Sequence, residues 1–265
     1  MADDIKKIKE LIIDTVKNSN AGHITSSYSC TEILYTLYKF ANINKENIAD
    51  NNRDRIIISK EHCRLAQCCI LAYLNLLDKN LLKEYCNTGG NLGHDIYNIV
   101  NPKISAVDYA SGSLGHGLSV GAGLAFGDKK HHVYVLVGDG ELQEGSIYEA
   151  LLFISQHNIK NITIIVDKNN MQIDNWTKEI IDTSSKIKDL MFALKFEVVC
   201  CNGHDVNEIE QALQIKSERP KCIIAETIKG KGIEFLLKDF SFAKFHHSSL
   251  TNIEFEKVYE AIRNE

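Results

Sequence analysis

The sequence has very little proline and no long apolar run, and both absences narrow what the chain can be. Its 265 residues include only two prolines, Pro102 and Pro220, and no low-complexity tract, so long linkers between separate domains are not expected. No segment approaches the roughly 18 consecutive apolar residues of a membrane span. The charged amino-terminal stretch also differs from a secretion signal. We therefore expect a cytoplasmic chain that does not enter a membrane.

An excess of positive charge is also missing. The 30 Lys and Arg residues against 35 Asp and Glu residues give a formal net charge of −5 at pH 7, so nothing indicates nucleic acid or an anionic membrane as a partner.

The eight cysteines contain no C-x-x-C pair, although Cys68–Cys69 and Cys200–Cys201 are adjacent. We predict buried free thiols in a reducing compartment and no zinc site.

What the sequence does contain is a regular alternation of helical and strand-like segments. The predicted helices span 4–17, 30–41, 62–77, 115–127, 144–158, 186–195, 206–216 and 252–263. The predicted strands span 55–59, 132–138, 161–168, 196–201 and 221–228. Near-continuous apolar strands between helices are typical of a parallel sheet covered on both faces. We predict one α/β domain over residues 1–265, with Ser29 or Thr31 capping its second helix and a long loop within 78–112.

A carboxylate stands at the end of one predicted strand. The run VYVLV is followed by Gly138, Asp139 and Gly140, and the next strand ends in Asn169 and Asn170. Ligands of open parallel sheets bind outside the carboxyl ends of the strands. Neighbouring strand ends could therefore bring the carboxylate and an amide oxygen to one Mg²⁺ or Ca²⁺ ion carrying a diphosphate. The alternative is a helix-capping aspartate plus an Asx turn. The occurrence of both residues at successive strand ends favours the ion site.

These motifs resemble those of a known family. Gly-Asp-Gly, followed after about thirty residues by Asn-Asn behind an apolar strand, is similar to the thiamine diphosphate signature. The segments GDGELQEGSIYEA (138–150) and DKNNMQID (167–174) resemble transketolase in particular, in its diphosphate-binding half. The resemblance implies the thiamine-diphosphate-binding fold of a PP domain. It also implies that Asp139, Asn169 and the carbonyl of Met171 hold Mg²⁺ or Ca²⁺.

The same resemblance assigns four more residues to the cofactor and its surroundings. Gly140 and Glu141 would lie at the diphosphate. Ile173 would pack near the thiazolium ring. Glu144 would lie at the interface between paired cofactor sites and is counted with the catalytic residues.

A glycine-rich stretch, SGSLGHG (111–117), also resembles a family motif. The resemblance implies that Gly112, Ser113 and Leu114 line the cofactor. Ser113 stands where full-length transketolases usually carry proline, and His116 where they carry glutamine. This form of the motif is similar to that of split transketolases encoded by two genes.

Four histidines match positions that the family uses near the diphosphate and the ketose: His23, His62, His94 and His246. The resemblance implies that His23 and His246 contact substrate hydroxyls. It places His62 at the diphosphate and His94 at the hydroxyl end of the donor. Imidazole suits these roles because it can donate to phosphate oxygens and exchange protons with hydroxyls.

The residues around the histidines depart from the family pattern. Glu61 replaces a glycine before His62, and His246 is preferred over His247 because Phe245 stands where the family has tryptophan. The metal and diphosphate motifs match better, so the cofactor is a firmer prediction than the substrate. The stretch IKGKGIEF (228–235) is either a pair of surface lysines or the family turn that precedes His246.

Transketolases activate their cofactor with a glutamate on a second, pyrimidine-binding domain. The resemblance implies that this chain is the N-terminal subunit of a split enzyme. A C-terminal transketolase subunit would supply the activating glutamate and the pyrimidine pocket in an α2β2 assembly. The reaction would transfer a two-carbon ketol unit between small sugars or sugar phosphates.

Two other functions stay open at this point. The α subunit of a 2-oxo-acid dehydrogenase or decarboxylase shares the metal motif and also needs a partner. A catalytically silent scaffold subunit is the second alternative, suggested by the altered residues beside the histidines. The separate histidines at 23, 62 and 94 favour transketolase over the dehydrogenase.

Overall fold

The computed structural model describes residues 2–87, 90, 92, 107–109, 112–173, 175–240 and 250–264. Most of the loop predicted within 78–112 lies outside these residues, as do His94 and His246. None of the described helices is both long and apolar enough to cross a membrane.

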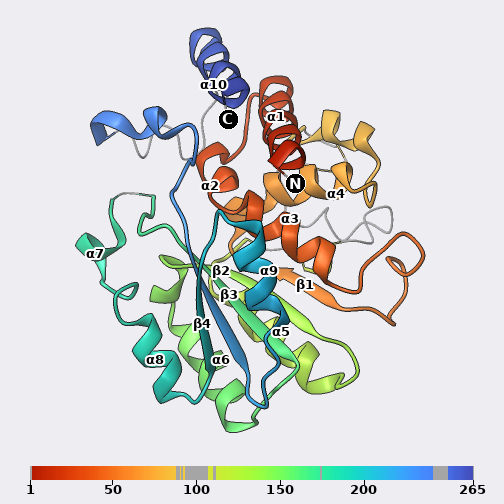
Figure 1. Ribbon diagram of the computed structural model, residues 1–265, viewed down its shortest axis with the longest axis vertical. Helices are drawn as coiled ribbons and strands as arrows, with labels where there is room; N and C mark the ends of the chain where they lie inside the picture. Colours follow the sequence, from red (N-terminus) through yellow and green to blue (C-terminus); the bar gives the residue numbers. More distant parts are fainter. Residues whose placement is uncertain are drawn as a thin grey trace.

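Five strands form one sheet in the order β1-β2-β3-β5-β4, and every neighbouring pair is parallel (Figure 1). The strands are β1 Arg55–Ile58, β2 Val133–Gly138, β3 Ile162–Lys168, β4 Glu197–Asn202 and β5 Lys221–Glu226. The predicted parallel α/β sheet is therefore confirmed. Because β2 and β3 are adjacent, their carboxyl ends meet at one edge of the sheet.

Helices cover both faces of this sheet. The first face carries α1 Ala2–Ser19, α2 Ile24–Ser29, α3 Thr31–Phe40, α4 Arg64–Tyr73 and α9 Val206–Gln214, and α10 Asn252–Asn264 packs against α1. The second face carries α5 His116–Gly127, α6 Gly145–Gln156 and α8 Ile187–Ala193. Shorter elements are α7 Thr177–Ile180 and the 3₁₀ turns η1 Glu61–Cys63, η2 Lys79–Glu84, η4 Glu141–Gln143 and η5 Glu234–Phe240.

The two faces explain why the strands are apolar throughout. Successive residues of a strand point to opposite faces of the sheet. In β1, Ile56 and Ile58 join the core with α1 to α4, whereas Ile57 joins the core with α5, α6 and α8. In β2, Tyr134 joins the core with α1 to α4, and Val135 joins the core with α5, α6 and α8. Along β1, β2, β3 and β5 almost every residue is buried, so the sequence shows no alternation with polar residues there, whereas β4 is only partly buried.

The start of the second predicted helix is different from the prediction. A separate short helix, α2, precedes it, and the N-cap of α3 is Cys30, which makes no side-chain capping bond. The two predicted caps have other partners. Ser29 donates its hydroxyl to Asp167 at 2.9 Å, and Thr31 donates to the Ser27 carbonyl at 2.8 Å. The capping prediction was wrong because a tertiary contact engages the Ser29 hydroxyl, and the Thr31 hydroxyl bonds to a carbonyl four residues earlier.

All eight cysteines are free. Six of them are buried as predicted, whereas Cys86 is half-buried and Cys200 is exposed. The prediction failed at Cys200 because β4 is an edge strand, and its pattern of burial is the weakest of the five strands.

Candidate functional site

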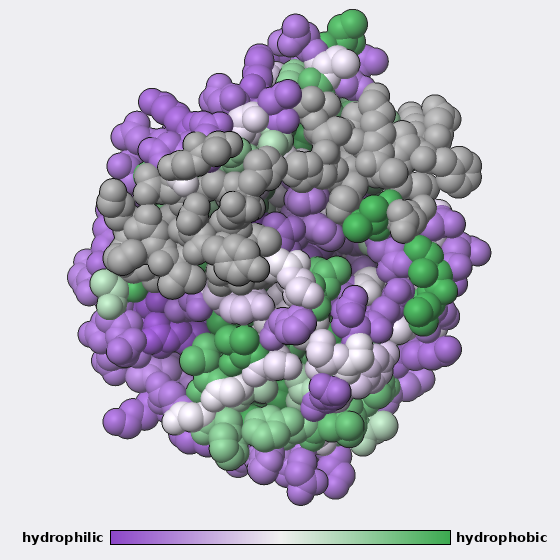
Figure 2. All heavy atoms as spheres, turned by 180° about the vertical axis from the view of Figure 1, so that it is seen from behind, coloured by the Kyte–Doolittle hydropathy of each residue, from purple (hydrophilic) through white to green (hydrophobic). Residues whose placement is uncertain are grey.

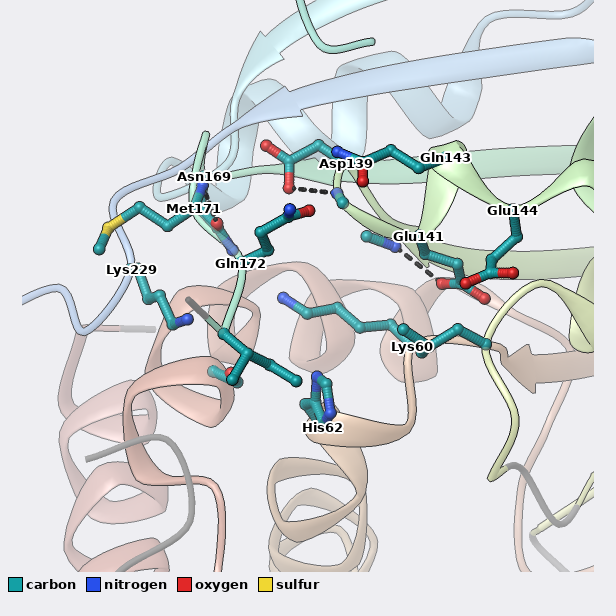
Figure 3. Close-up of a pocket in the computed structure, with 15 residues that line it drawn as sticks. Lys60, His62, Asp139, Glu141, Gln143, Glu144, Asn169, Met171, Gln172 and Lys229 are labelled. Atoms are coloured by element: carbon teal, nitrogen blue, oxygen red, sulfur yellow. Dashed lines mark hydrogen bonds between the residues drawn. The ribbon is translucent and has the colours of Figure 1, made fainter. Parts of the chain in front are cut away.

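A pocket lies at the carboxyl ends of the strands (Figure 3). Nine of the predicted site residues line it: His62, Leu114, Asp139, Gly140, Glu141, Glu144, Asn169, Met171 and Ile173. The remaining lining residues are Ser26, Lys60, Gly138, Gln143, Gln172 and Lys229. Gly112 and Ser113 are exposed and do not line this pocket. The structure thus brings together residues that span more than half of the sequence.

Asp139 lies against the turn that follows the neighbouring strand. Its backbone N–H donates to the carbonyl of Asp167 at 3.3 Å, continuing the pairing of β2 with β3. Its Oδ2 accepts from the backbone N–H of Asn170 at 2.5 Å, and its Oδ1 accepts from Gly140 N–H at 2.9 Å. The N-caps of η4 and α6 are Gly140 and Glu144. The helix-cap alternative for Asp139 is therefore wrong.

The electrostatics of Asp139 favour a bound cation. The side chain is only 1% exposed, and none of the ion pairs among the described residues includes it. Burial raises the pKa of Asp139 to about 6, and the negative charge of Asp167 adds to the rise. A buried carboxylate without a positive partner is costly. A metal ion at this oxygen would remove that cost.

Asn169 presents its amide in a fixed orientation. Its Nδ2 donates to the Ser29 hydroxyl at 3.2 Å, which directs Oδ1 the other way. Oδ1 accepts from the backbone N–H of Met171 at 3.0 Å. This contact is the Asx turn of the alternative interpretation, so that part of it is correct. An amide oxygen has two lone pairs, however, and the turn leaves one for a metal.

Two buried lysines reach into the pocket from different elements (Figure 3). Lys60 follows β1 and forms an ion pair with Asp167. Burial lowers the pKa of Lys60, but the charge and hydrogen bond of Asp167, together with Cys63 and Cys30, raise this pKa overall. Lys229 follows β5 and is 4% exposed. Burial lowers the pKa of Lys229 to about 8, and the positive charge of Lys60 adds to the effect.

Neither lysine was selected from the sequence. The surface interpretation of 228–235 is wrong for Lys229, which is buried. The signal that would have found both lysines is the one used for Asp139, because each follows a predicted strand by no more than three residues. The carboxyl ends of β1 and β5 therefore contribute to the pocket as those of β2 and β3 do.

Asp167 connects the Asn169 side of the pocket with Lys60. It is fully buried and lies in β3, two residues before Asn169. Its Oδ1 accepts from the hydroxyls of Ser29 and Thr227, and its Oδ2 accepts from Lys60. Ser29 also accepts from Asn169, so one carboxylate orients both a lysine and, through Ser29, the amide.

Glu141 uses its carboxylate on the protein itself. Oε1 accepts from the Ser59 hydroxyl and from Gly115 N–H at 2.8 Å, and Oε2 accepts from Gly138 N–H at 3.0 Å. Burial raises the pKa of Glu141, and these donors partly offset the rise. The side chain therefore fastens the start of α5 to the ends of β1 and β2.

Two of the predicted histidines lie together. The ring of His23, which precedes α2, lies 4.6 Å from the ring of His62, which is in η1. His62 lines the pocket, and a carboxylate oxygen of Glu61 is 4.0 Å from its Nε2. The substitution of glycine by Glu61 thus places a negative charge beside the histidine pair.

Comparison with known proteins identifies the family of these motifs. The family model described as "Transketolase, thiamine diphosphate binding domain" matches residues 2–261. One subunit of the apulose-4-phosphate transketolase of Phocaeicola vulgatus is 32% identical, over 97% of this chain and 91% of its own length. The 6-deoxy-6-sulfo-D-fructose transketolase subunit SqwG of a Clostridium species is 30% identical, over 86% of this chain and 84% of its own.

The fold comparison gives the same family. The crystal structure of transketolase from Campylobacter jejuni matches 99% of this chain with a TM-score of 0.85 and 29% identity. The chain spans only 42% of that solved chain. A transketolase from Leishmania mexicana, with a TM-score of 0.82 and 22% identity, shares the fold.

Proposed function

Since this chain belongs to the transketolase family and carries its thiamine diphosphate binding domain, we propose that it is the N-terminal subunit of a split transketolase. The enzyme would transfer a two-carbon ketol unit from a ketose, or a ketose phosphate, to an aldehyde acceptor. One observation carries the proposal. A single pocket brings an unpaired buried carboxylate, an oriented amide oxygen and two buried lysines together at the ends of the strands.

The residues of the pocket suit a divalent metal and a diphosphate. Asp139, Asn169 and the Met171 carbonyl offer hard oxygen ligands, which Mg²⁺ or Ca²⁺ prefers. Lys60 and Lys229 offer positive charge to the phosphate oxygens. Gly140 leaves room for the side chain of Gln172, because a Cβ at position 140 would lie 2.8 Å from Oε1 of Gln172. A side chain here would force Gln172, which also lines the pocket, to shift.

When bound, thiamine diphosphate supplies the carbon nucleophile of ketol transfer. The chain itself would bind the cofactor, orient the substrate and move protons. Ile173, which is 41% exposed at the pocket, offers an apolar surface to a ring. His62 and His23 lie close enough to act on neighbouring oxygens, with His62 at the pocket wall. We assign His94 and His246 to the substrate hydroxyls, and Gly112 and Ser113 to the cofactor, as the family resemblance implies.

We further propose that the pyrimidine-binding domain lies on a partner chain. The proposal is supported by the relatives named as transketolase subunits, since this chain matches them over most of their own lengths. The partner would supply the activating glutamate and the pocket for the pyrimidine. Free cysteines throughout the chain agree with a cytoplasmic, reducing location for this enzyme.

An apolar patch supports an assembly with more than one copy. Figure 2 shows apolar side chains gathered on the lower half of the face opposite to that of Figure 1. The exposed apolar residues of α5 and α6 are Val120, Leu124, Phe126, Tyr148, Leu152 and Phe153. The rings of Phe126 and Phe153 lie 5.4 Å apart and join the two helices. We propose that a second copy of this chain covers the patch in an α2β2 enzyme, with Glu144 near that interface.

The test is a ketol-transfer assay on the two purified chains with thiamine diphosphate and Mg²⁺. Turnover by the mixture, and by neither chain on its own, is the expected result. Cofactor binding without any turnover of ketose donors would favour a silent scaffold subunit instead. Full activity of this chain by itself would contradict the split enzyme.

A further inference from the structure

His204 does not line the pocket and has no role in the ketol transfer proposed for this chain. It lies in the turn between β4 and α9, and its side chain is 11% exposed. Its Nε2 accepts from the backbone N–H of Ile228 at 2.8 Å, and its Nδ1 lies 3.1 Å from Oε2 of Glu32. A backbone amide can only donate, so Nε2 must carry the lone pair. The hydrogen is therefore on Nδ1 and is donated to Glu32.

The acceptor on the other side of the ring is itself held in place. Glu32 is 5% exposed in α3, and its Oε1 lies 3.7 Å from Nζ of Lys9, a buried residue of α1. The imidazole is thus a rigid bridge. It runs from the helices of the first face to the segment that follows β5.

That segment carries Lys229, whose backbone is fixed on both sides. Ile228, directly before it, is held by His204. Gly230, directly after it, donates its N–H to the Thr25 carbonyl at 2.9 Å and has a φ of 68°. None of the ion pairs among the described residues includes Lys229, although the side chain is 4% exposed. A buried ammonium without an ion-pair partner is costly, and a backbone held on both sides limits the other directions that this side chain can take.

We propose that His204 is a positioning residue for the cofactor diphosphate. By accepting from Ile228 N–H it fixes the peptide before Lys229 and keeps that ammonium directed into the pocket. The inference rests on the proposed function, because Lys229 matters only if a diphosphate enters there. His204 itself touches no pocket atom, so it acts through Lys229.

Two near-isosteric variants separate the two contacts of the ring. His204→Gln places an amide near the position of Nε2 and can still accept from Ile228 N–H. His204→Asn places an amide near the position of Nδ1, so it keeps the donor to Glu32 but loses the acceptor. Binding is measured on the assembled enzyme, which contains this chain and its partner. The probes are thiamine diphosphate with Mg²⁺ and thiamine, which lacks the diphosphate.

We expect H204N to weaken binding of thiamine diphosphate about tenfold, the size of one lost hydrogen bond, and to leave thiamine binding and kcat at saturating cofactor unchanged. H204Q should stay within about threefold of the wild type. Lys229→Met should weaken diphosphate binding at least as much as H204N. In the K229M background, H204N should have no further effect, because the pair acts as one unit.

Each other outcome has a distinct meaning. If K229M leaves diphosphate binding unchanged, the proposed role of the pocket lysine is wrong. If K229M weakens binding and H204N does not, the inference about His204 is wrong and the proposed function stands. Equal losses for thiamine and thiamine diphosphate, or a loss that persists in the K229M background, would show a merely structural histidine. If H204N does not fold, His204→Met removes the same acceptor and serves in the same cycle.

Discussion

The backbone N–H of Asn170 donates to Oδ2 of Asp139 at 2.5 Å. The carboxylate at the end of β2 therefore lies directly on the turn at the end of β3. Asn169, one residue earlier in that turn, lines the same pocket as Asp139. The relationship explains how a parallel sheet can bring residues about thirty positions apart together at the proposed ion site.

Removing the charge of Asp139 should separate cofactor binding from folding. We expect Asp139→Asn to weaken Mg²⁺-dependent binding of thiamine diphosphate at least a hundredfold, because the ion loses its charged ligand. The free energy of unfolding without metal should fall by less than about 1 kcal/mol, since the variant also removes an unpaired buried carboxylate. Calorimetric titration and urea unfolding measure the two effects. Asp189→Asn on the exposed side of α8 is the control, and retained tight binding by D139N would contradict the assignment.

The lowered pKa of Lys229 gives a pH dependence with a definite sign. In the free pocket this pKa is about 8, because of burial and the charge of Lys60, and a bound diphosphate should raise it. Binding above pH 8 must then take up a proton and weaken as the pH rises. Asp139, with a pKa of about 6, and Lys60, with a raised pKa, do not titrate in that range.

Calorimetry at pH 8.5 to 9, in buffers of different ionisation enthalpy, measures this proton uptake. The wild type should take up a fraction of one proton, and Lys229→Met should take up none. Identical enthalpies in all buffers for the wild type would show that Lys229 does not meet the diphosphate.

A half-buried histidine away from the site should make folding sensitive to acid. Burial lowers the pKa of His132 to about 4, and its Nε2 lies 2.8 Å from the Thr163 hydroxyl. The unfolded state binds the proton more readily, so this contribution to stability is complete above pH 6.5 and is lost as the pH falls from 6.5 toward 4. We expect about 2–3 kcal/mol less stability at pH 4 than at pH 7 from this residue.

Urea unfolding of the wild type and of His132→Gln over that range measures the effect. The glutamine can keep a bond to Thr163 but cannot titrate. The difference in stability between the two proteins should change with pH in the direction given. A constant difference would mean that His132 is not the sensitive group.

Replacing each of two glycines, one at the start of α5 and one within it, with alanine should change the free energy of unfolding in opposite directions. Gly115 has a φ of 85°, and a Cβ there would lie 2.5 Å from the Ser146 hydroxyl. Gly115→Ala should therefore lower the free energy of unfolding by more than about 2 kcal/mol. Gly123, inside α5, has no atom near its added Cβ, so Gly123→Ala should raise it by about 0.5–1 kcal/mol. Thermal unfolding of both variants is the measurement, and equal effects would contradict the packing described for the start of α5.

A charge in the apolar patch should break the assembly without unfolding the chain. Leu152 of α6 is 59% exposed and lies within the patch. Leu152→Glu should leave the melting temperature of this chain unchanged and lower the mass of the assembled enzyme in light scattering. Ile253→Glu on α10, a position that is 71% exposed outside the patch, is the matched control. An unchanged mass for L152E would remove this face as the contact between copies.

Much of this fold could be predicted from the sequence because its strands are buried on both faces. The run around Val135 is apolar, and the run around Ile164 is interrupted only by Thr163, a pattern that is typical of strands in a parallel sheet. Asp139 and Asn169 could be found because a strand end is a local feature, and the topology then brings successive ends together.

What could not be predicted depends on contacts between distant residues. The strand before Lys60 indicates where this lysine lies, but no local pattern indicates that it pairs with Asp167, which is 107 residues away. The same holds for His204 and Glu32, 172 residues apart. The position of Ser29 before a predicted helix indicates a cap, but its hydroxyl bonds to Asp167 on another element, which the local sequence does not show. Local patterns specify the elements, whereas the polar network of the pocket exists only after they pack.

The most direct test of the ion site is a crystal structure of the assembled enzyme with thiamine diphosphate and Ca²⁺. One ion should bind oxygens of Asp139, Asn169 and the Met171 carbonyl at about 2.3–2.6 Å, with the diphosphate on its open side. The account would be contradicted by an ion elsewhere, for example between His23, Glu61 and His62, whose ligand atoms lie within 4.8 Å of one another. It would also be contradicted by a cofactor bound with no ion at Asp139.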